Sequence, residues 1–529
     1  MYAAISSLAS MISRVLGPTL ASGNPFDDES YKNEFISELK EHTLQLADDI
    51  WKEFWDEDVD LFCNKRPSAE TVPLGFYNGY TVWTFTIGLQ AIIEAEKLSP
   101  GRYTDKIATA TEILQERYYN TEFKAYSAWL HSKGDSDVYY DDNAQIAIAF
   151  VDTYLAFKEH KYLELARELC HFLITGWTES DSAPGGIQWH VGDEAPHTDR
   201  CCCSTAITGI ALLRTVDALR SHIQVLKSRP TKSKIQLSDE EKQSDWVALE
   251  HASDEFIEEI EKDIQKFVDI ATKCGKWLVD TLLITEKDRK GDALTHLIAD
   301  KMTQSDDSYW KRDEHTILSY NIGSTIQLLC LLHNEANITQ GSSPSLKGID
   351  FAETIHILAA TSITPYKAIF NTSAPNPAKR VWSDYPYFTH LLIEGLLVYT
   401  NTFPNHPKNK EVINMILHNV AYMKNHLSDA KNPLFYHRNL RLTHISPEKT
   451  TEWNETMGVM EKMSLDKTER VYDEPWEDTE GTTMARTLLA NGGVARGFAL
   501  TAGELGRKKA LEEQTRRILT SASLVAGDW

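Results

Sequence analysis

The sequence predicts an all-α protein whose helices form two layers around a closed ring, an α/α barrel. Apolar residues recur at i, i+3, i+4 and i+7 along most of the chain, the spacing of amphipathic helices, and strand-like alternation is hard to find. Residues 87–95 and 144–157 are apolar nearly all round. Helices of that kind are buried on more than one side, as the inner layer of a barrel is. A solenoid would instead show a fixed repeat period, which this sequence lacks.

The apolar stripes predict about a dozen helices, joined by loops that carry Gly, Pro, Asn and Asp. In the first half of the chain we expect helices over residues 33–56, 79–97, 104–118, 141–158, 161–176 and 203–220. In the second half we expect them near residues 253–284, 316–335, 349–363, 386–402, 410–427 and 482–505, with a final helix near 507–524. Asn491-Gly492-Gly493 is interpreted as an interruption of a helix.

Two polar stretches interrupt the helical pattern without dividing the chain into two cores. Residues 224–252 are rich in Lys, Ser, Asp and Glu, which is typical of a solvated loop or a charged helix extension. Residues 434–480 are irregular and acidic, and loops of that length are usually functional or disordered. We therefore expect a flexible N-terminal extension over 1–28 and one catalytic domain over 29–529 that carries both stretches.

The charge balance disfavours two classes of partner. The 77 acidic residues outnumber the 54 basic ones, which leaves a formal charge of −23. Such a surface repels phosphate backbones and anionic lipids, so nucleic acid and membrane surfaces are poor partners. No run of 18 uncharged apolar residues predicts a membrane span. The first 22 residues lack a basic n-region and a clean apolar segment, which favours a cytoplasmic location over secretion.

The cysteines and histidines predict no metal site and no cofactor. Seven cysteines, with a triplet at Cys201–Cys203, do not form a disulfide framework or zinc-ligand spacing, and we interpret them as small buried residues of a reducing compartment. His190 and His197 flank an acidic loop that could ligate a metal, but a solvated surface loop explains it better. Phosphate-binding glycine loops, nucleophile elbows and zinc motifs are absent from the sequence.

An adjacent pair of aspartates is the sharpest local feature. Tyr140-Asp141-Asp142-Asn143 stands where a polar loop gives way to an apolar helix. The two aspartates could simply cap that helix, since Asp is favoured there. They could also reach one cavity together, because neighbouring α-carbons lie about 3.8 Å apart. Retaining glycosidases use two carboxyl groups about 5–5.5 Å apart, and like charges that close push the two pKa values apart.

Three further segments give the aspartate pair its context. Gly185-Gly186-Ile187-Gln188-Trp189 follows some forty residues later, Tyr162–Ala166 lies between them, and Ser319-Tyr320-Asn321-Ile322-Gly323 opens a later helix. From about residue 70 to 430, this ordered set resembles glycoside hydrolase family 76, the endo-α-1,6-mannanases. The resemblance implies an (α/α)6 barrel, a toroid of helical hairpins. It also implies a retaining mechanism with Asp141 as nucleophile and Asp142 as general acid and base.

The chain departs from the family pattern in three places. The family commonly carries a Trp shortly after the aspartate pair, where this chain has Gln145. Asn residues commonly follow the Gly-Gly-Ile-x-Trp segment, where this chain has Thr198-Asp199-Arg200 and the cysteine triplet. Ile322 replaces a Gln of the later segment. These departures concern mannan specificity more than the fold.

Other helix entries supply candidate substrate-binding residues. Trp189 could stack on a sugar or belong to the core, and Asn321 could line the pocket beside Tyr320 or cap its helix. Asp384 opens another apolar helix as a cap or as part of a polar rim, and Trp83 lies at the start of the second helix. Tyr140 and Asn143 are also candidate substrate-binding residues, because they stand directly beside the aspartates in the sequence.

The sequence thus predicts a glycoside hydrolase, retaining in mechanism, that cleaves an α-linked mannoside or related α-glycan in an oligosaccharide or polysaccharide. One alternative is a sugar isomerase of the N-acylglucosamine 2-epimerase type on the same toroid, which relies on histidines at the barrel centre. Another is a carbohydrate-binding homologue without catalytic activity. Fold alone does not decide among them.

Overall fold

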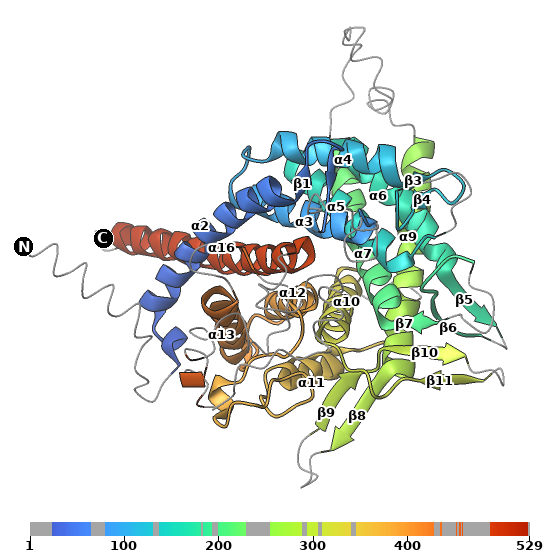
Figure 1. The fold of residues 1–529 in the computed structure, drawn as a ribbon. Coiled ribbons are helices and arrows are strands. Elements are labelled where there is room, and N and C mark those ends of the chain that lie inside the picture. Colours follow the sequence, from blue (N-terminus) through green and yellow to red (C-terminus); the bar gives the residue numbers. More distant parts are fainter. Residues whose placement is uncertain are drawn as a thin grey trace, which may run out of the picture.

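In the computed structural model of the protein, two layers of helices surround one axis (Figure 1). The structure describes residues 24–64, 80–130, 137–180, 183–192, 199–228, 254–287, 294–304, 309–339, 345–427, 434–435, 451, 454–455, 458 and 487–526. The predicted extension 1–28, the charged insertion 224–252 and the segment 434–480 lie largely outside these residues.

In the part of the chain that the structure describes, six helices form the inner layer and six the outer layer. The inner helices are α3 (Val82–Leu98), α5 (Tyr140–Phe157), α7 (Cys202–Ser228), α10 (Ser319–Ile338), α12 (Pro386–Thr402) and α16 (Leu488–Ala526). Each packs against the next in this order, and α16 packs against α3, which closes the ring. All six enter the ring from the same end, because an outer helix returns the chain between successive inner ones.

Six more helices form the outer layer. They are α2 (Glu29–Phe54), α4 (Thr104–Tyr118), α6 (His160–Leu173), α9 (Asp254–Trp277), α11 (Ala352–Ser362) and α13 (Asn409–His426). Each one packs on an inner partner: α2 on α16, α4 on α3, α6 on α5, α9 on α7, α11 on α10 and α13 on α12. This arrangement is an (α/α)6 barrel, and it confirms the predicted fold class.

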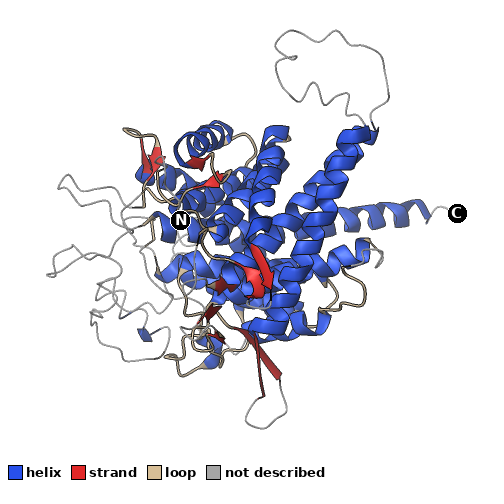
Figure 2. Ribbon diagram, turned by 90° about the vertical axis from the view of Figure 1, so that its right-hand side faces the viewer, coloured by secondary structure: helices blue, strands red, loops and turns tan. Residues whose placement is uncertain are grey.

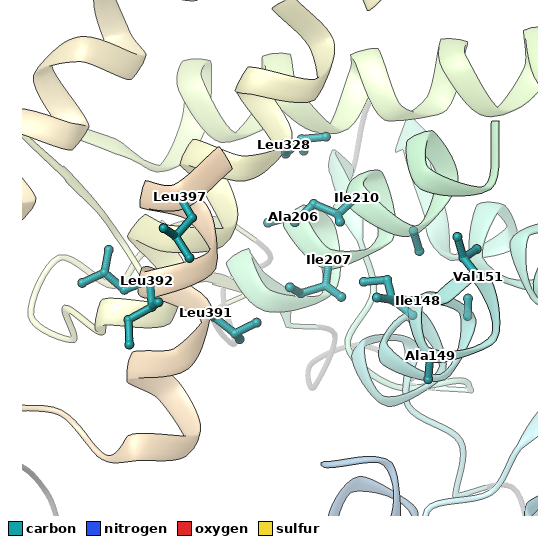
Figure 3. Close-up of a cluster of buried hydrophobic side chains, with 14 of the residues drawn as sticks. Ile148, Ala149, Val151, Ala206, Ile207, Ile210, Leu328, Leu391, Leu392 and Leu397 are labelled. Carbon is teal, nitrogen blue, oxygen red and sulfur yellow. The ribbon is translucent and has the colours of Figure 1, made fainter. Parts of the chain in front are cut away.

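Burial follows the layers as the apolar patterns predict. Every residue of α3 from Thr84 to Glu96 is buried, whereas the outer helix α9 buries one face, with Ile260, Phe267 and Ala271 inward. Apolar side chains of α5, α7, α10 and α12 gather between the inner helices (Figure 3). Residues Cys202–Lys227 are long and apolar enough to cross a membrane, but 83% of the most apolar 18-residue window in this stretch is buried, as in a core helix.

Short strands lead from outer helices into inner ones (Figure 2). The hairpins are β1 (Trp55–Asp56) with β2 (Leu61–Phe62), β3 (Tyr119–Asn120) with β4 (Ala125–Tyr126), β5 (Trp177–Ser180) with β6 (Ala183–Ile187), and β8 (Leu283–Lys287) with β9 (Leu294–Ile298). A three-stranded sheet places β10 (Lys301–Gln304) between β7 (Arg200–Cys201) and β11 (Trp310–Arg312). Short 3-10 turns lie at η1 (Pro25–Asp27), η2 (Ile174–Gly176) and η5 (Pro377–Lys379).

Two predicted helix ends were wrong. The helix expected over 253–284 ends at Trp277, because the chain passes through a π-helical turn, η4 (Leu278–Leu282), into β8, whose backbone groups pair with β9. The two helices expected over 482–505 and 507–524 are one helix, α16.

The glycines of α16 do not interrupt it. A Cβ on Gly493 would lie 2.7 Å from the backbone of Tyr387 in α12, and a Cβ on Gly492 would overlap the side chain of Ile87 in α3. Asn491 binds the backbone of Phe435 through both its amide nitrogen and its oxygen. These three residues therefore permit close packing and anchor a loop, which explains why the helix continues through them.

Candidate active site

A cavity of about 370 Å³ opens at the end of the barrel where the inner helices begin. Its walls come mainly from the first turns of α3, α5, α7, α10 and α12, and from the loops around β6, β7 and β10. The lining residues are Thr81, Trp83, Thr86, Ile87, Gln90, Ala128, Trp129, Tyr139, Asp141, Asp142, Gln145, Trp189, Asp199, Cys201, Cys203, Ile207, Asp300, Lys301, Tyr320, Tyr387, Phe388, His390 and Leu391.

Asp141 and Asp142 lie in the first turn of α5, and both line this cavity. Tyr139 occupies the N-cap position, and no side chain caps the helix. Asp141 accepts a hydrogen bond on Oδ2 from the Trp189 indole at 3.3 Å, and its buried Oδ1 has no partner among the described residues. The pair therefore faces the cavity and does not serve as a helix cap.

Burial and mutual repulsion separate the two carboxyl groups in proton affinity. Burial, the charge of Asp141 and the charge of Asp137 raise the pKa of Asp142 well above its usual value. Burial also raises the pKa of Asp141, but hydrogen bonds from the Cys203 thiol, nearby backbone amides and Trp189 oppose that shift. Asp141 is thus the group that ionises first, and Asp142 is the group that keeps the shared proton.

The loop before α7 brings Trp189 beside the aspartates. Gly185 and Gly186 both have positive φ angles, +83° and +84°, and a Cβ on Gly186 would lie 2.8 Å from the ring of Trp277. The Trp189 carbonyl accepts a hydrogen bond from the Tyr140 amide at 3.0 Å. Trp189 is 40% exposed, so its ring is a platform at the cavity wall and not part of the core.

Trp83 and Tyr320 also line the cavity. The Trp83 ring contacts Tyr387 edge-on with centroids 5.7 Å apart, and the Tyr320 ring packs on Phe388 at 4.5 Å. The Tyr320 hydroxyl donates to Asp300 at 3.3 Å. Aromatic faces of this kind suit the apolar faces of sugar rings.

Four predicted site residues do not line the cavity. Tyr140 stacks on Phe172 with centroids 4.7 Å apart. Asn143 is fully buried and bridges backbone groups of Tyr126. Both residues hold α5 in place from behind the aspartates.

The other two of the four act at the start of α10. The Asn321 amide donates to Asp300 at 2.9 Å, and an oxygen of Asp384 accepts from both the amide and the hydroxyl of Ser319 at 2.9 Å. Asp384, just before the neighbouring helix α12, therefore supports the first residue of α10, and Asn321 holds a cavity carboxylate.

Several cavity residues escaped sequence reasoning. Asp199 forms an ion pair with Lys301, and burial raises the pKa of Asp300. Cys201 and Cys203 of the triplet face the cavity as free thiols. Asp199 and the cysteine triplet stand together in the chain, but Asp300 and Lys301 lie far from them in sequence, and no local motif indicates that these segments meet in one cavity.

Two further expectations from the sequence concern Gln145 and the histidines of the acidic loop. Gln145, which stands where the family commonly has Trp, lines the cavity and accepts a hydrogen bond from Gln90 at 2.9 Å. His190 binds Asp137 at 3.1 Å, whereas His197 lies outside the described residues. In the part of the chain that the structure describes, no three His, Cys, Asp or Glu side chains are grouped so as to hold a metal ion.

Comparisons with known proteins relate the chain to a family and to one relative. The model of Glycosyl hydrolase family 76 matches residues 38–211. A relative in Schizosaccharomyces pombe, the meiotically up-regulated gene 191 protein, is 26% identical over 476 residues, which span 88% of this chain and 91% of that protein.

Two solved structures share the fold. A family 76 glycoside hydrolase (mannosidase) from Bacteroides thetaiotaomicron matches with a TM-score of 0.55 and 18% identity, over 89% of this chain and 100% of that one. An inactive variant of an α-1,6-mannanase from Salegentibacter sp. HEL1_6, in complex with α-1,6-mannotriose, matches with a TM-score of 0.54 and 15% identity, over 88% and 99% of the two chains.

The class of protein follows from these observations together. The family match and the (α/α)6 fold support a glycoside hydrolase. The family model over residues 38–211 bears out the resemblance to family 76 that the sequence motifs indicate, and the solved structures share its fold.

Proposed function

We propose that this protein is a retaining glycoside hydrolase that cleaves an α-linked mannoside or a related α-glycan. Asp141 acts as the nucleophile and Asp142 as the general acid and base. The observation that carries this proposal is the unequal electrostatic surroundings of two adjacent buried carboxyl groups, one poised as an anion and the other as an acid. Enzymes separate two such roles by separating two pKa values.

The first step forms a glycosyl-enzyme. The Asp141 carboxylate attacks the anomeric carbon while Asp142 gives its proton to the leaving glycosidic oxygen, so that the C–O bond of the substrate breaks as the ester bond forms. Esterification removes the negative charge of Asp141. Because that charge helps to raise the pKa of Asp142, the pKa of Asp142 then falls.

The second step uses this fall in pKa. Asp142, now a carboxylate, takes a proton from a water molecule, whose oxygen attacks the anomeric carbon and releases Asp141. Two inversions at one carbon leave the product with the configuration of the substrate. A single carboxyl pair therefore serves both steps, and the charge state of one member sets the role of the other.

The cavity lining favours an uncharged glycan. Trp83, Trp129 and Trp189 present aromatic surface, and the carboxylates Asp199 and Asp300 disfavour anionic sugars. The Salegentibacter protein described above was captured with α-1,6-mannotriose, as a variant in which two consecutive aspartates are asparagines. That complex supports α-1,6-linked mannose as the first substrate to test and the aspartate pair as the first residues to change.

The test compares purified wild type with Asp141→Asn and Asp142→Asn on α-mannosides and α-glucosides, with product anomers followed by NMR. We expect wild type to release sugar with retained configuration and each variant to lose at least about 100-fold in kcat/KM. Asp142→Asn should keep the first step on an aryl glycoside, whose leaving group needs no proton. Asp269→Asn, on outer helix α9, is the matched control that should keep wild-type rates.

Two outcomes would overturn the proposal. Wild type that binds glycans but hydrolyses none would indicate the carbohydrate-binding homologue. Full activity in both asparagine variants would place the chemistry elsewhere in the cavity.

A further inference from the structure

His390 of α12 lines the cavity one turn below the entry of the helix. The side chain is 2% exposed, so it lies at the inner end of the site, below Tyr387 of the preceding turn. Sequence reasoning assigned no role to this residue, because it sits inside an otherwise apolar helix.

The Arg496 guanidinium fixes the protonation of this ring. Arg496 Nη1 lies 2.8 Å from His390 Nδ1, and a guanidinium can only donate. Nδ1 therefore keeps its lone pair, and the proton of the neutral ring is on Nε2. Burial and the charge of Arg496 hold the pKa of His390 well below its usual value, against a smaller opposing contact with the Tyr387 carbonyl. Among the described residues no side chain accepts a hydrogen bond from Nε2.

Arg496 is itself held by a charged network that crosses the barrel. The guanidinium, 1% exposed, donates to Glu394 at 2.7 Å, and Gln327 donates to the other oxygen of Glu394 at 3.1 Å. The network continues as a chain of ion pairs through Arg214, Asp152, Lys97 and Glu94.

Every inner helix supplies a member of this axial network, and its cations and anions balance. The cations are Arg496, Arg214 and Lys97, and the anions are Glu394, Asp152 and Glu94. The imidazole is therefore not needed to neutralise a charge, and a neutral ring fits its surroundings. What the network gives His390 is a fixed orientation and a fixed tautomer.

We propose that His390 is a substrate-contacting residue whose Nε2–H donates a hydrogen bond to a hydroxyl oxygen of the sugar bound beside Asp141 and Asp142. Arg496 is a positioning residue that acts through His390. This inference rests on the proposed glycosidase function and adds a specificity determinant to it. A buried donor without a side-chain partner gains from a ligand that supplies an acceptor, and a site built this way rejects analogues that lack that group.

Two substitutions separate the substrate contact from the structural one. In His390→Asn, the amide oxygen takes about the place of Nδ1 and can still accept from Arg496, but no donor remains at the place of Nε2. In His390→Gln, the amide nitrogen takes about the place of Nε2. We expect both variants to unfold near the wild-type temperature, because each keeps a polar contact in the buried site.

Binding is measured by calorimetry with α-1,6-mannotriose in the Asp142→Asn background, and turnover in the active background. We expect His390→Asn to weaken binding and lower kcat/KM by about tenfold, and His390→Gln to recover most of that loss. A panel of deoxy-mannosides identifies the hydroxyl, because the analogue that lacks it binds equally well to the parent protein and to His390→Asn. Arg496→Lys should weaken binding in the His390 protein but add little in the His390→Asn protein.

A folded His390→Asn variant with unchanged Kd, kcat and KM would overturn this inference while leaving the proposed function intact. Wild type that hydrolyses no glycan would instead overturn the proposed function. In that event, equal Kd values for α-1,6-mannotriose in the parent protein and in His390→Asn would also refute the contact between His390 and the sugar. A tenfold difference between the two Kd values would retain His390 as a residue that binds the sugar.

Discussion

Alanine at Gly323 should destabilise the barrel at the point where α10 and α12 touch. Gly323 and Gly395 face each other across these two inner helices with no side chain between their backbones. A Cβ on Gly323 would lie 2.6 Å from the backbone nitrogen of Leu392, whereas real Cβ contacts stay beyond 3.0 Å. The obstacle is backbone, so no side chain can rotate away, and the helices would have to separate.

The magnitude follows from two opposing effects. Alanine gains about 1 kcal/mol of helix propensity over glycine, and overpacking costs about 3 kcal/mol or more where backbones must move. We therefore expect Gly323→Ala to lower the free energy of unfolding by about 2–3 kcal/mol. At about 2.1 cal/mol/K per residue, 529 residues give an unfolding entropy of about 1.1 kcal/mol/K, so Tm should fall by roughly 2–3 °C.

The assay is thermal unfolding followed by circular dichroism, with urea unfolding as a second measure. Gly506→Ala is the matched control, because Gly506 also lies inside a helix and nothing lies within 4 Å of a Cβ added there. The free energy of unfolding of that variant should rise by up to about 1 kcal/mol, a change of opposite sign to that of Gly323→Ala. A Gly323→Ala protein as stable as wild type would show that the α10–α12 contact yields more easily than its geometry implies.

Two further predictions concern the carboxyl pair. The rate of hydrolysis should fall as pH drops through the pKa of Asp141, which must be ionised, and as pH rises through the pKa of Asp142, which must be protonated. Cys203→Ala removes a hydrogen bond that lowers the pKa of Asp141, so it should move the acidic limb of the pH–rate profile to higher pH. An unmoved limb would refute that role of Cys203. Asp142→Asn should raise Tm at pH 7 by roughly 1–3 °C and leave it unchanged at pH 3. The reason is that the carboxyl group of the unfolded chain ionises above about pH 4, whereas the folded one keeps its proton. A gain in Tm that persists at pH 3 would contradict this explanation.

The sequence predicted the parts of the site that are continuous in the chain. The aspartate pair and Trp189 stand in short segments whose order along the chain is recognisable. Residues such as Asp300, Cys203 and His390 could not be anticipated. They come from three separate segments of the chain, and the ring closure that brings them together depends on contacts between distant helices.

The fold was predicted at the level of helices and missed at the level of hairpins. Strands of two to five residues are too short for alternation to show, and the pairs that join outer to inner helices were therefore invisible. Gly492 and Gly493 indicated an interruption because glycine is a poor helix former, but close packing against α3 and α12 overrides that preference. The same reasoning explains Gly323 in the later motif, whose missing side chain admits α12.

The hydrogen bonds of His390 also bear on the choice between hydrolysis and isomerisation on this toroid. A sugar epimerase needs a side chain that takes a proton from a carbon atom, and a histidine can do so only through a ring nitrogen with a free lone pair. In His390 the lone pair of Nδ1 is engaged by Arg496, and Nε2, the nitrogen left for the cavity, already carries the proton. Burial and Arg496 together disfavour any added positive charge on the ring, so it cannot gain a proton during catalysis without a large cost. Asp141 and Asp142, by contrast, present one carboxylate and one acid to the same cavity. The electrostatics of the site therefore favour glycosidic bond cleavage by the aspartates, with His390 as a donor to the bound sugar.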